Sequence, residues 1–142
     1  MWADTLFRAE QQHLLRLLLW SATSILGGTA VSVVTVIRRV KSPLLTNFAI
    51  QTAAWGVFVG GIAAAWWHLA GLRDLAGAAR LERVLWLTMG LDVGCVAAGA
   101  VLAVAAWVFS RRLGGVGAGT AIAIQGLALL VLDMQFASTV SR

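Results

Sequence analysis

The hydrophobic residues of this chain gather into four long runs that are separated by short polar stretches. The runs cover residues 14–37, 44–70, 84–109 and 116–136. At about 1.5 Å per residue, each run is long enough to cross the roughly 30 Å hydrocarbon core of a bilayer as a helix. Backbone amides in lipid must be hydrogen-bonded within their own segment, so each run is predicted to be helical. The pattern therefore predicts four membrane-spanning helices.

Two of the connections between the runs are very short, and they determine the expected topology. Residues 38–43 contain the only proline of the chain, Pro43, and residues 110–115 end in a pair of glycines. Short turns place consecutive helices side by side in antiparallel order. We therefore expect an all-α, up-down four-helix bundle that forms a single transmembrane domain over residues 1–142.

The connection between the second and third runs is longer and amphipathic. From Leu72 to Leu85 the leucines fall on one face of a helix, whereas Arg73, Asp74 and Arg80 fall elsewhere. Such a segment is typical of a helix that lies in the plane of the membrane surface. We expect a short interfacial helix between spans two and three.

The composition excludes a water-soluble fold. Hydrophobic residues make up 60% of the 142 residues and charged residues only 12%, against about 25% charged residues in a soluble domain. Four spans consume almost the whole chain, which leaves no room for a catalytic domain in water. Cys95 is the only cysteine, so an internal disulfide or a cysteine-based metal site is excluded. The charged N-terminal segment does not resemble a cleaved signal peptide, so the first span is expected to remain.

The positive charges indicate an orientation. Five of them, and no negative charge, lie in the two short connections: Arg38, Arg39, Lys41, Arg111 and Arg112. Short loops rich in arginine and lysine stay in the cytoplasm. We therefore expect both termini to lie outside, in an N-out, C-out arrangement. The net charge of +5 is localised to these connections, so binding of nucleic acid is not expected.

Polar residues inside the apolar runs are the main candidates for a site. Arg16, Asp92, Asp133 and His68 are all predicted to lie near the outer end of the bundle. A charge within lipid costs roughly 2.5 to 3.5 kcal/mol on insertion scales, so we expect Arg16 to pair with one or both aspartates. Two interpretations remain open. The cluster is either a structural ion pair or a site for a ligand or a proton.

A second polar set lies deeper, with Asn47 and Gln51 near the inner side and Gln125 near the middle of span four. Hydrogen bonds between helices are the expected role, and a polar path through the bundle is the alternative. No metal site and no cofactor are predicted. The only cofactor that the sequence would allow is a haem bound by His13 and His68, at the outer ends of spans one and two.

Small residues mark the expected contacts between helices, because in lipid helices associate through close packing of their backbones. We expect glycines to provide these contacts within the bundle, with docking onto another protein as the alternative. The predicted packing positions are Gly27, Gly28, Gly56, Gly60, Gly90, Gly94, Gly119 and Gly126.

Several short motifs are characteristic when taken together: Arg16 with Trp20, Gly27-Gly28, Asn47 with Trp55, the run from Leu91 to Gly94, and Gln125-Gly126 followed by Asp133. In these motifs residues 14–136 resemble a family of small, uncharacterised four-helix bacterial membrane proteins. The resemblance implies a location in the bacterial inner membrane and a role for the arginine and the two aspartates. It implies no activity.

The sequence favours a non-catalytic protein, because no nucleophile with a nearby base and no metal triad can be recognised. Our first hypothesis is an accessory or assembly subunit that packs against a larger membrane complex of respiratory or photosynthetic type. The alternative is an oligomeric protein that binds or transports a small molecule, a proton or an ion through the outer Arg/Asp/His cluster. Expected partners are the lipid bilayer and either other membrane subunits or further copies of the chain.

Overall fold

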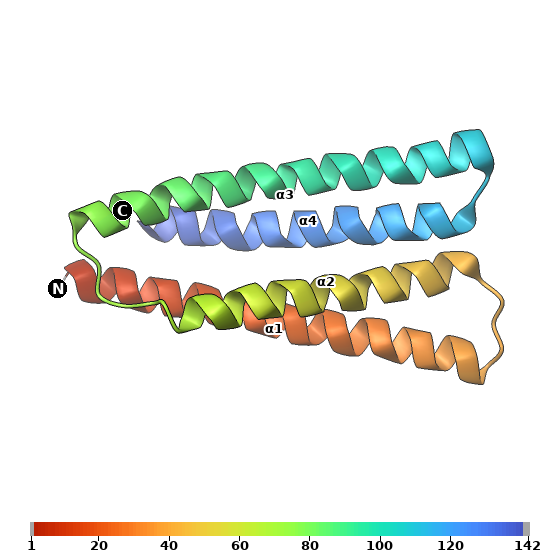
Figure 1. The fold of residues 1–142 in the computed structure, drawn as a ribbon, viewed down its shortest axis with the longest axis horizontal. Coiled ribbons are helices and arrows are strands. Elements are labelled where there is room, and N and C mark those ends of the chain that lie inside the picture. Colours follow the sequence, from red (N-terminus) through yellow and green to blue (C-terminus); the bar gives the residue numbers. More distant parts are fainter. Residues whose placement is uncertain (1, 141–142) are drawn as a thin grey trace.

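The computed structural model describes residues 2–140, which form four helices and no strand (Figure 1). The helices are α1 (Trp2–Ile37), α2 (Pro43–Trp67), α3 (Leu75–Ser110) and α4 (Leu113–Val140). Each of them is long and apolar enough to cross a membrane. The expected all-α, four-helix class is confirmed.

The helices run up and down, so the bundle has two unlike ends (Figure 1). The N-terminus, the C-terminus and the connection between α2 and α3 lie at one end, which we call the terminal end. The two tight turns, residues 38–42 and 111–112, lie at the other, which we call the turn end. Ser42 begins α2 as its N-cap, since its hydroxyl accepts a hydrogen bond from the backbone N–H of Leu45.

At the terminal end the prediction of a separate interfacial helix was wrong, and the first helix is longer than its apolar run. Helix α1 already begins at Trp2, and the expected interfacial helix is instead the beginning of α3. Asp74 caps α3, because its carboxylate accepts a hydrogen bond of 2.7 Å from the backbone N–H of Gly77. From there the helix continues without a break, with Leu81 and Leu85 buried in the bundle. Its charged residues therefore occupy an exposed face and do not mark a separate helix.

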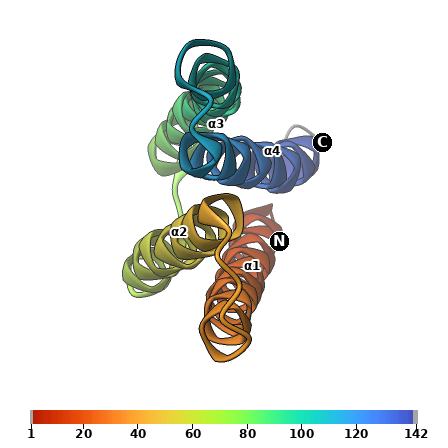
Figure 2. The same ribbon diagram turned by 90° about the vertical axis from the view of Figure 1, so that its right-hand side faces the viewer.

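The four helices form two hairpins, α1 with α2 and α3 with α4, that meet along α4 (Figure 2). Helix α4 packs closely against α3 and α2, and it also contacts α1. Helices α2 and α3 remain apart, since no Cα atom of one lies within 8 Å of a Cα atom of the other. At the terminal end a small hydrophobic cluster of Leu6, Leu81, Leu85 and Phe136 joins α1, α3 and α4, and Trp66 of α2 packs against it.

Glycines produce the closest helix contacts, although not at every predicted position. A methyl group added to Gly28 would lie 2.5 Å from the carbonyl oxygen of Ala49, so α1 and α2 touch through their backbones there. Gly56, Gly60, Gly119 and Gly126 are similarly crowded. The prediction was wrong for three glycines that have no neighbour within 4 Å of an added methyl group and lie on exposed faces: Gly27, Gly90 and Gly94.

A pair of alanine substitutions on α3 tests these contacts. A methyl group at Gly99 would lie 2.5 Å from the amide nitrogen of Ala123 on α4, so Gly99→Ala should lower the free energy of unfolding by about 1 to 3 kcal/mol. Gly94→Ala is the matched control, because an added methyl group there meets nothing and alanine favours the helix. Unfolding in one detergent, followed by circular dichroism, measures both. Equal effects of the two changes would contradict the close contact between α3 and α4.

Candidate functional site

A cavity of about 380 Å³ lies in the terminal half of the bundle. All four helices line it, and most of its walls are apolar, with Leu14 from α1, Val59 and Ile62 from α2, Leu91 from α3 and Leu129 from α4. The polar groups that reach the cavity are few: Glu10, His13, Thr88, Asp92 and Asp133. A cavity that combines apolar walls with a few convergent polar groups is the usual form of a small-molecule site.

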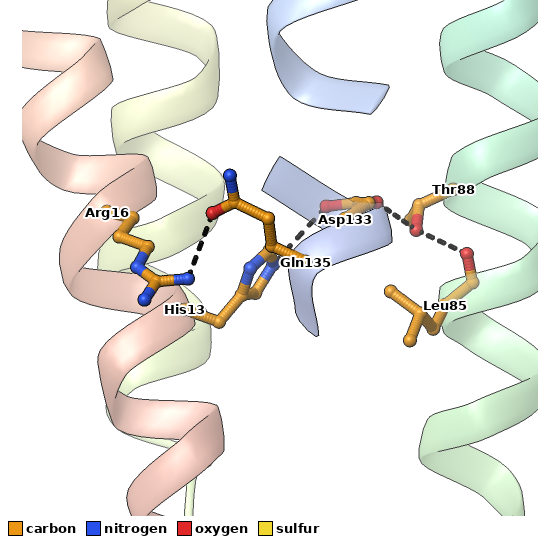
Figure 3. Close-up of polar contacts among 6 residues, drawn as sticks. All are labelled: His13, Arg16, Leu85, Thr88, Asp133 and Gln135. Carbon is orange, nitrogen blue, oxygen red and sulfur yellow. Dashed lines mark hydrogen bonds and ion pairs between the residues drawn. The ribbon is translucent and has the colours of Figure 1, made fainter. Parts of the chain in front are cut away.

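Asp133 lies at the centre of a polar chain that joins three helices (Figure 3). Its Oδ1 atom is 3.3 Å from Nε2 of His13 on α1, and its Oδ2 atom is 2.7 Å from the hydroxyl of Thr88 on α3. The imidazole of His13 also stacks on the ring of Phe136, with 4.6 Å between the ring centroids. Both oxygens of the buried carboxylate are therefore satisfied, and the imidazole is held in place.

Two polar atoms that line the cavity have no hydrogen-bond partner among the described residues. They are Oδ2 of Asp92 and Nδ1 of His13. Each of these residues is only 8% exposed. Buried polar atoms are nearly always hydrogen-bonded, so these two atoms are available to a bound molecule or water.

A second ion pair lies beside the cavity, where Glu10 of α1 contacts Arg73 of the connection between α2 and α3. The carboxylate of Glu10 is buried and accepts hydrogen bonds from Nη2 and Nε of Arg73, at 2.6 and 3.0 Å. The indole N–H of Trp66 donates a third, at 3.1 Å. The hydrogen bond with Glu10 raises the pKa of Arg73 above its ordinary value, so the guanidinium remains charged. This pair fastens the connection between α2 and α3 to α1.

The pair could not be predicted from the apolar runs, because Glu10 and Arg73 both lie outside them. The spacing of the sequence does indicate that Glu10 faces the bundle. It lies on the same helical face as His13, Leu14 and Leu17, which follow it by three, four and seven residues. All four residues line the cavity.

The predicted cluster of Arg16, Asp92, Asp133 and His68 is not assembled as expected. Arg16 is exposed, and its Nη1 atom donates a hydrogen bond of 3.1 Å to Oε1 of Gln135 (Figure 3). His68 is exposed at the end of α2 and does not line the cavity. His13 takes the place of the arginine beside Asp133, because it lies on the buried face of α1 while the long side chain of Arg16 extends along the outside.

The histidines also do not form the haem site that the sequence would allow. His13 faces the cavity and contacts Asp133, whereas His68 lies outside the cavity. Within residues 2–140 no group of three histidine, cysteine or acidic side chains could hold a metal ion.

The deeper polar residues separate into two roles. Gln125 is buried and joins α4 to α1, because its carbonyl accepts a hydrogen bond from the indole N–H of Trp20 at 2.8 Å and its amide donates to Ser24 at 3.1 Å. Asn47 donates to the carbonyl of Pro43 in its own helix, at 2.9 Å. No hydrogen bond among the described residues connects Asn47 or Gln51 with Gln125, so the three amides do not form a polar path.

Comparison with known protein families matches residues 16–134 to DUF6992, a family of unknown function. The chain belongs to this family. No curated protein and no solved structure matches it. The match confirms the resemblance noted in the sequence to an uncharacterised family. It includes both aspartates of the cavity, but not Glu10 or His13. Membership of a family of unknown function supplies no activity. The feature of this DUF6992 protein that bears on its function is therefore the cavity.

Removing one partner of the terminal ion pair should be far more costly than removing both. Arg73→Met leaves a buried carboxylate without its cation, so we expect a loss of about 3 kcal/mol in the free energy of unfolding. Adding Glu10→Leu should restore most of this loss. Arg16→Met is the control and should change stability by less than about 0.5 kcal/mol, because Arg16 is exposed.

Unfolding by guanidinium, monitored by tryptophan fluorescence, measures the unchanged protein, Arg73→Met, Glu10→Leu, the double variant and Arg16→Met. Since the pKa of Arg73 is raised, the contribution of the pair is present below that pKa and should not fade as the pH rises toward 10. Losses that simply add in the double variant would contradict a coupled, buried pair.

Proposed function

We propose that this chain is a non-catalytic, multi-pass protein of the bacterial inner membrane that binds an amphiphilic small molecule in the cavity. The observation that carries the proposal is the combination of apolar walls with two buried polar atoms that lack partners. The five positive charges at the turn end support an orientation with the terminal end outside. The cavity would then lie in the outer half of the bilayer.

The shape of the cavity supports entry from the membrane. Three of its lining residues are largely exposed: Phe58 at 59%, Ile62 at 46% and Leu91 at 60%. The first two belong to α2 and the third to α3, the two helices whose backbones remain apart. The opening is therefore on the side of the bundle between these helices. In a bilayer this side faces lipid, so a ligand with an apolar body could enter without crossing water.

The polar groups favour binding over a purely structural ion pair. In a structural pair the partners satisfy one another, as Glu10 and Arg73 do in this bundle. Asp92 instead keeps an unsatisfied oxygen within an otherwise apolar space. The volume of about 380 Å³ also lies within the range of about 300 to 1,000 Å³ that is common for small-molecule sites.

Filling the cavity should expel a bound amphiphile. Ala63 on α2 lines the cavity and is fully buried, whereas its neighbour Ala64 is exposed. We expect mass spectrometry of the protein purified from its membrane to find an amphiphile in near-equal amount. Ala63→Leu should reduce this amount several-fold, and Ala64→Leu should leave it unchanged.

Cys95→Phe fills the cavity from the opposite wall, on α3, and should have the same effect as Ala63→Leu. Thermal unfolding shows which variants remain folded. If folded variants of both walls retain the same bound molecules as the unchanged protein, the binding proposal is wrong.

The accessory or assembly subunit is our second proposal, and the last three turns of α1 support it. Beyond Gly28 the helix diverges from the rest of the bundle (Figure 1), and it leaves most of its surface uncovered by this chain. Val36 and Ile37 are 77% and 73% exposed. A helix of a larger membrane complex, of respiratory or photosynthetic type, could pack against this segment.

Mild solubilisation followed by affinity purification and mass spectrometry tests the subunit proposal. We expect partner proteins in fixed proportion, and their loss when Val34, which is 51% exposed on α1, is changed to tryptophan. Val108→Trp on α3 is the matched control, because that residue is exposed to a similar extent. A protein that always runs alone or only with copies of itself would contradict a role as a subunit of a larger complex.

A further inference from the structure

We propose that the ligand of the cavity is a cationic amphiphile, in which an apolar body carries a protonated amine that binds Asp92 and His13. This inference rests on the proposed function, since it names the class of molecule that the cavity takes. Three features of the lining residues support a cationic ligand. They are the polar atoms without hydrogen-bond partners, the excess of carboxyl groups over cationic side chains, and the aromatic side chains.

The two unfilled atoms are both suited to accept hydrogen bonds. Oδ2 of Asp92 is a carboxyl oxygen. Nε2 of His13 contacts the carboxylate of Asp133, and an imidazole that donates through Nε2 in its neutral form has Nδ1 as an acceptor. Two donors of the lining residues are already engaged, since the indole N–H of Trp66 contacts Glu10 and the hydroxyl of Thr88 contacts Asp133. An ammonium group carries only donors, so it would supply hydrogen bonds to both acceptors.

The charges of the lining residues lead to the same class of ligand. No lysine or arginine lines the cavity among the described residues, although three carboxyl groups do. Glu10 is matched by Arg73, and Asp133 is held by His13 and Thr88. Asp92 alone has neither a cation nor a donor at Oδ2. A charge in the membrane interior requires a partner, so a cationic ligand is favoured and an anionic one is repelled.

Three aromatic side chains of α2 line the cavity. Phe58 lies at the exposed side, and its ring packs edge-on against Trp55, with 5.6 Å between the centroids. Trp66 contributes a third aromatic side chain to the wall. The faces of such rings attract cations, and most strongly where water is excluded. The walls would therefore stabilise the charged head as well as the apolar body.

Three probes with the same twelve-carbon chain separate head-group charge from hydrophobicity: dodecylammonium, dodecanol and dodecanoate. The full chain is placed in nanodiscs of phosphatidylcholine, and the probes are compared at equal mole fraction in the membrane. Cys95 provides the readout, because it is the only cysteine of the chain and lines the cavity. A bound probe should slow its alkylation by a maleimide, and each protein is compared with itself without probe.

We expect dodecylammonium to protect Cys95 at a concentration at least about tenfold lower than dodecanol, and dodecanoate to protect least. Asp92→Asn keeps the size of the side chain and should abolish this preference for dodecylammonium over dodecanol. Glu82→Gln is the matched control on the same helix, because Glu82 is exposed and does not line the cavity. It should retain the full preference.

Equal protection by the three probes, or an undiminished preference in Asp92→Asn, would overturn the assignment of a cationic ligand. Binding of an amphiphile would still stand, because the mass spectrometry of cavity-filling variants tests it separately. Failure of dodecylammonium to protect Cys95 at any concentration would also overturn the assignment. Native mass spectrometry of the probe-bound protein gives a second measure of the same preference, independent of cysteine reactivity.

Discussion

Lipid offers no partner for a buried charge, so each ionisable side chain within the bundle depends on what the protein places beside it. Glu10 is met by Arg73 from a connecting segment, and Asp133 is met by a histidine of α1 and a threonine of α3. These contacts tie the two hairpins together at the terminal end. Asp92 is the exception, because its Oδ2 atom has no hydrogen-bond partner among the described residues. This unpartnered oxygen distinguishes the cavity as the candidate site.

The cavity has a steric origin in the distribution of small residues. The glycines of α4 lie in its first half, from Gly114 to Gly126, and allow α2 and α3 to approach it closely. From Leu127 onward α4 contains no glycine, and α2 lies further from it at the terminal end than at the turn end (Figure 1). Residues of both helices, among them Val59 and Leu129, line the cavity there. The distribution of glycines in α4 therefore accounts for its close packing near the turn end and for its wider spacing from α2 around the cavity.

The sequence predicted the parts of this structure that depend on one helix at a time. Four apolar runs gave the helices, and the aspartates were conspicuous because charge is rare in such runs. It could not predict partners, because these depend on which face each helix turns inward. His13 and Arg16 are three residues apart, yet only the first reaches Asp133. Gly90 and Gly94 are four residues apart, which is the spacing of a helix contact, but they lie on an exposed face of α3. Arg73 lies in a connection outside the apolar runs, so its position in the sequence did not indicate a buried partner.

The two ends of the bundle differ in how much surface they offer to molecules in water. At the turn end the connections are only residues 38–42 and 111–112, whereas α1 and α3 have 36 residues each and exceed the roughly 30 Å that a bilayer requires. With the turn end at one surface of a bilayer, their extra turns would project beyond the bilayer on the terminal side. A soluble protein would therefore find a platform on one side of the membrane and almost none on the other, so recognition from water should be one-sided.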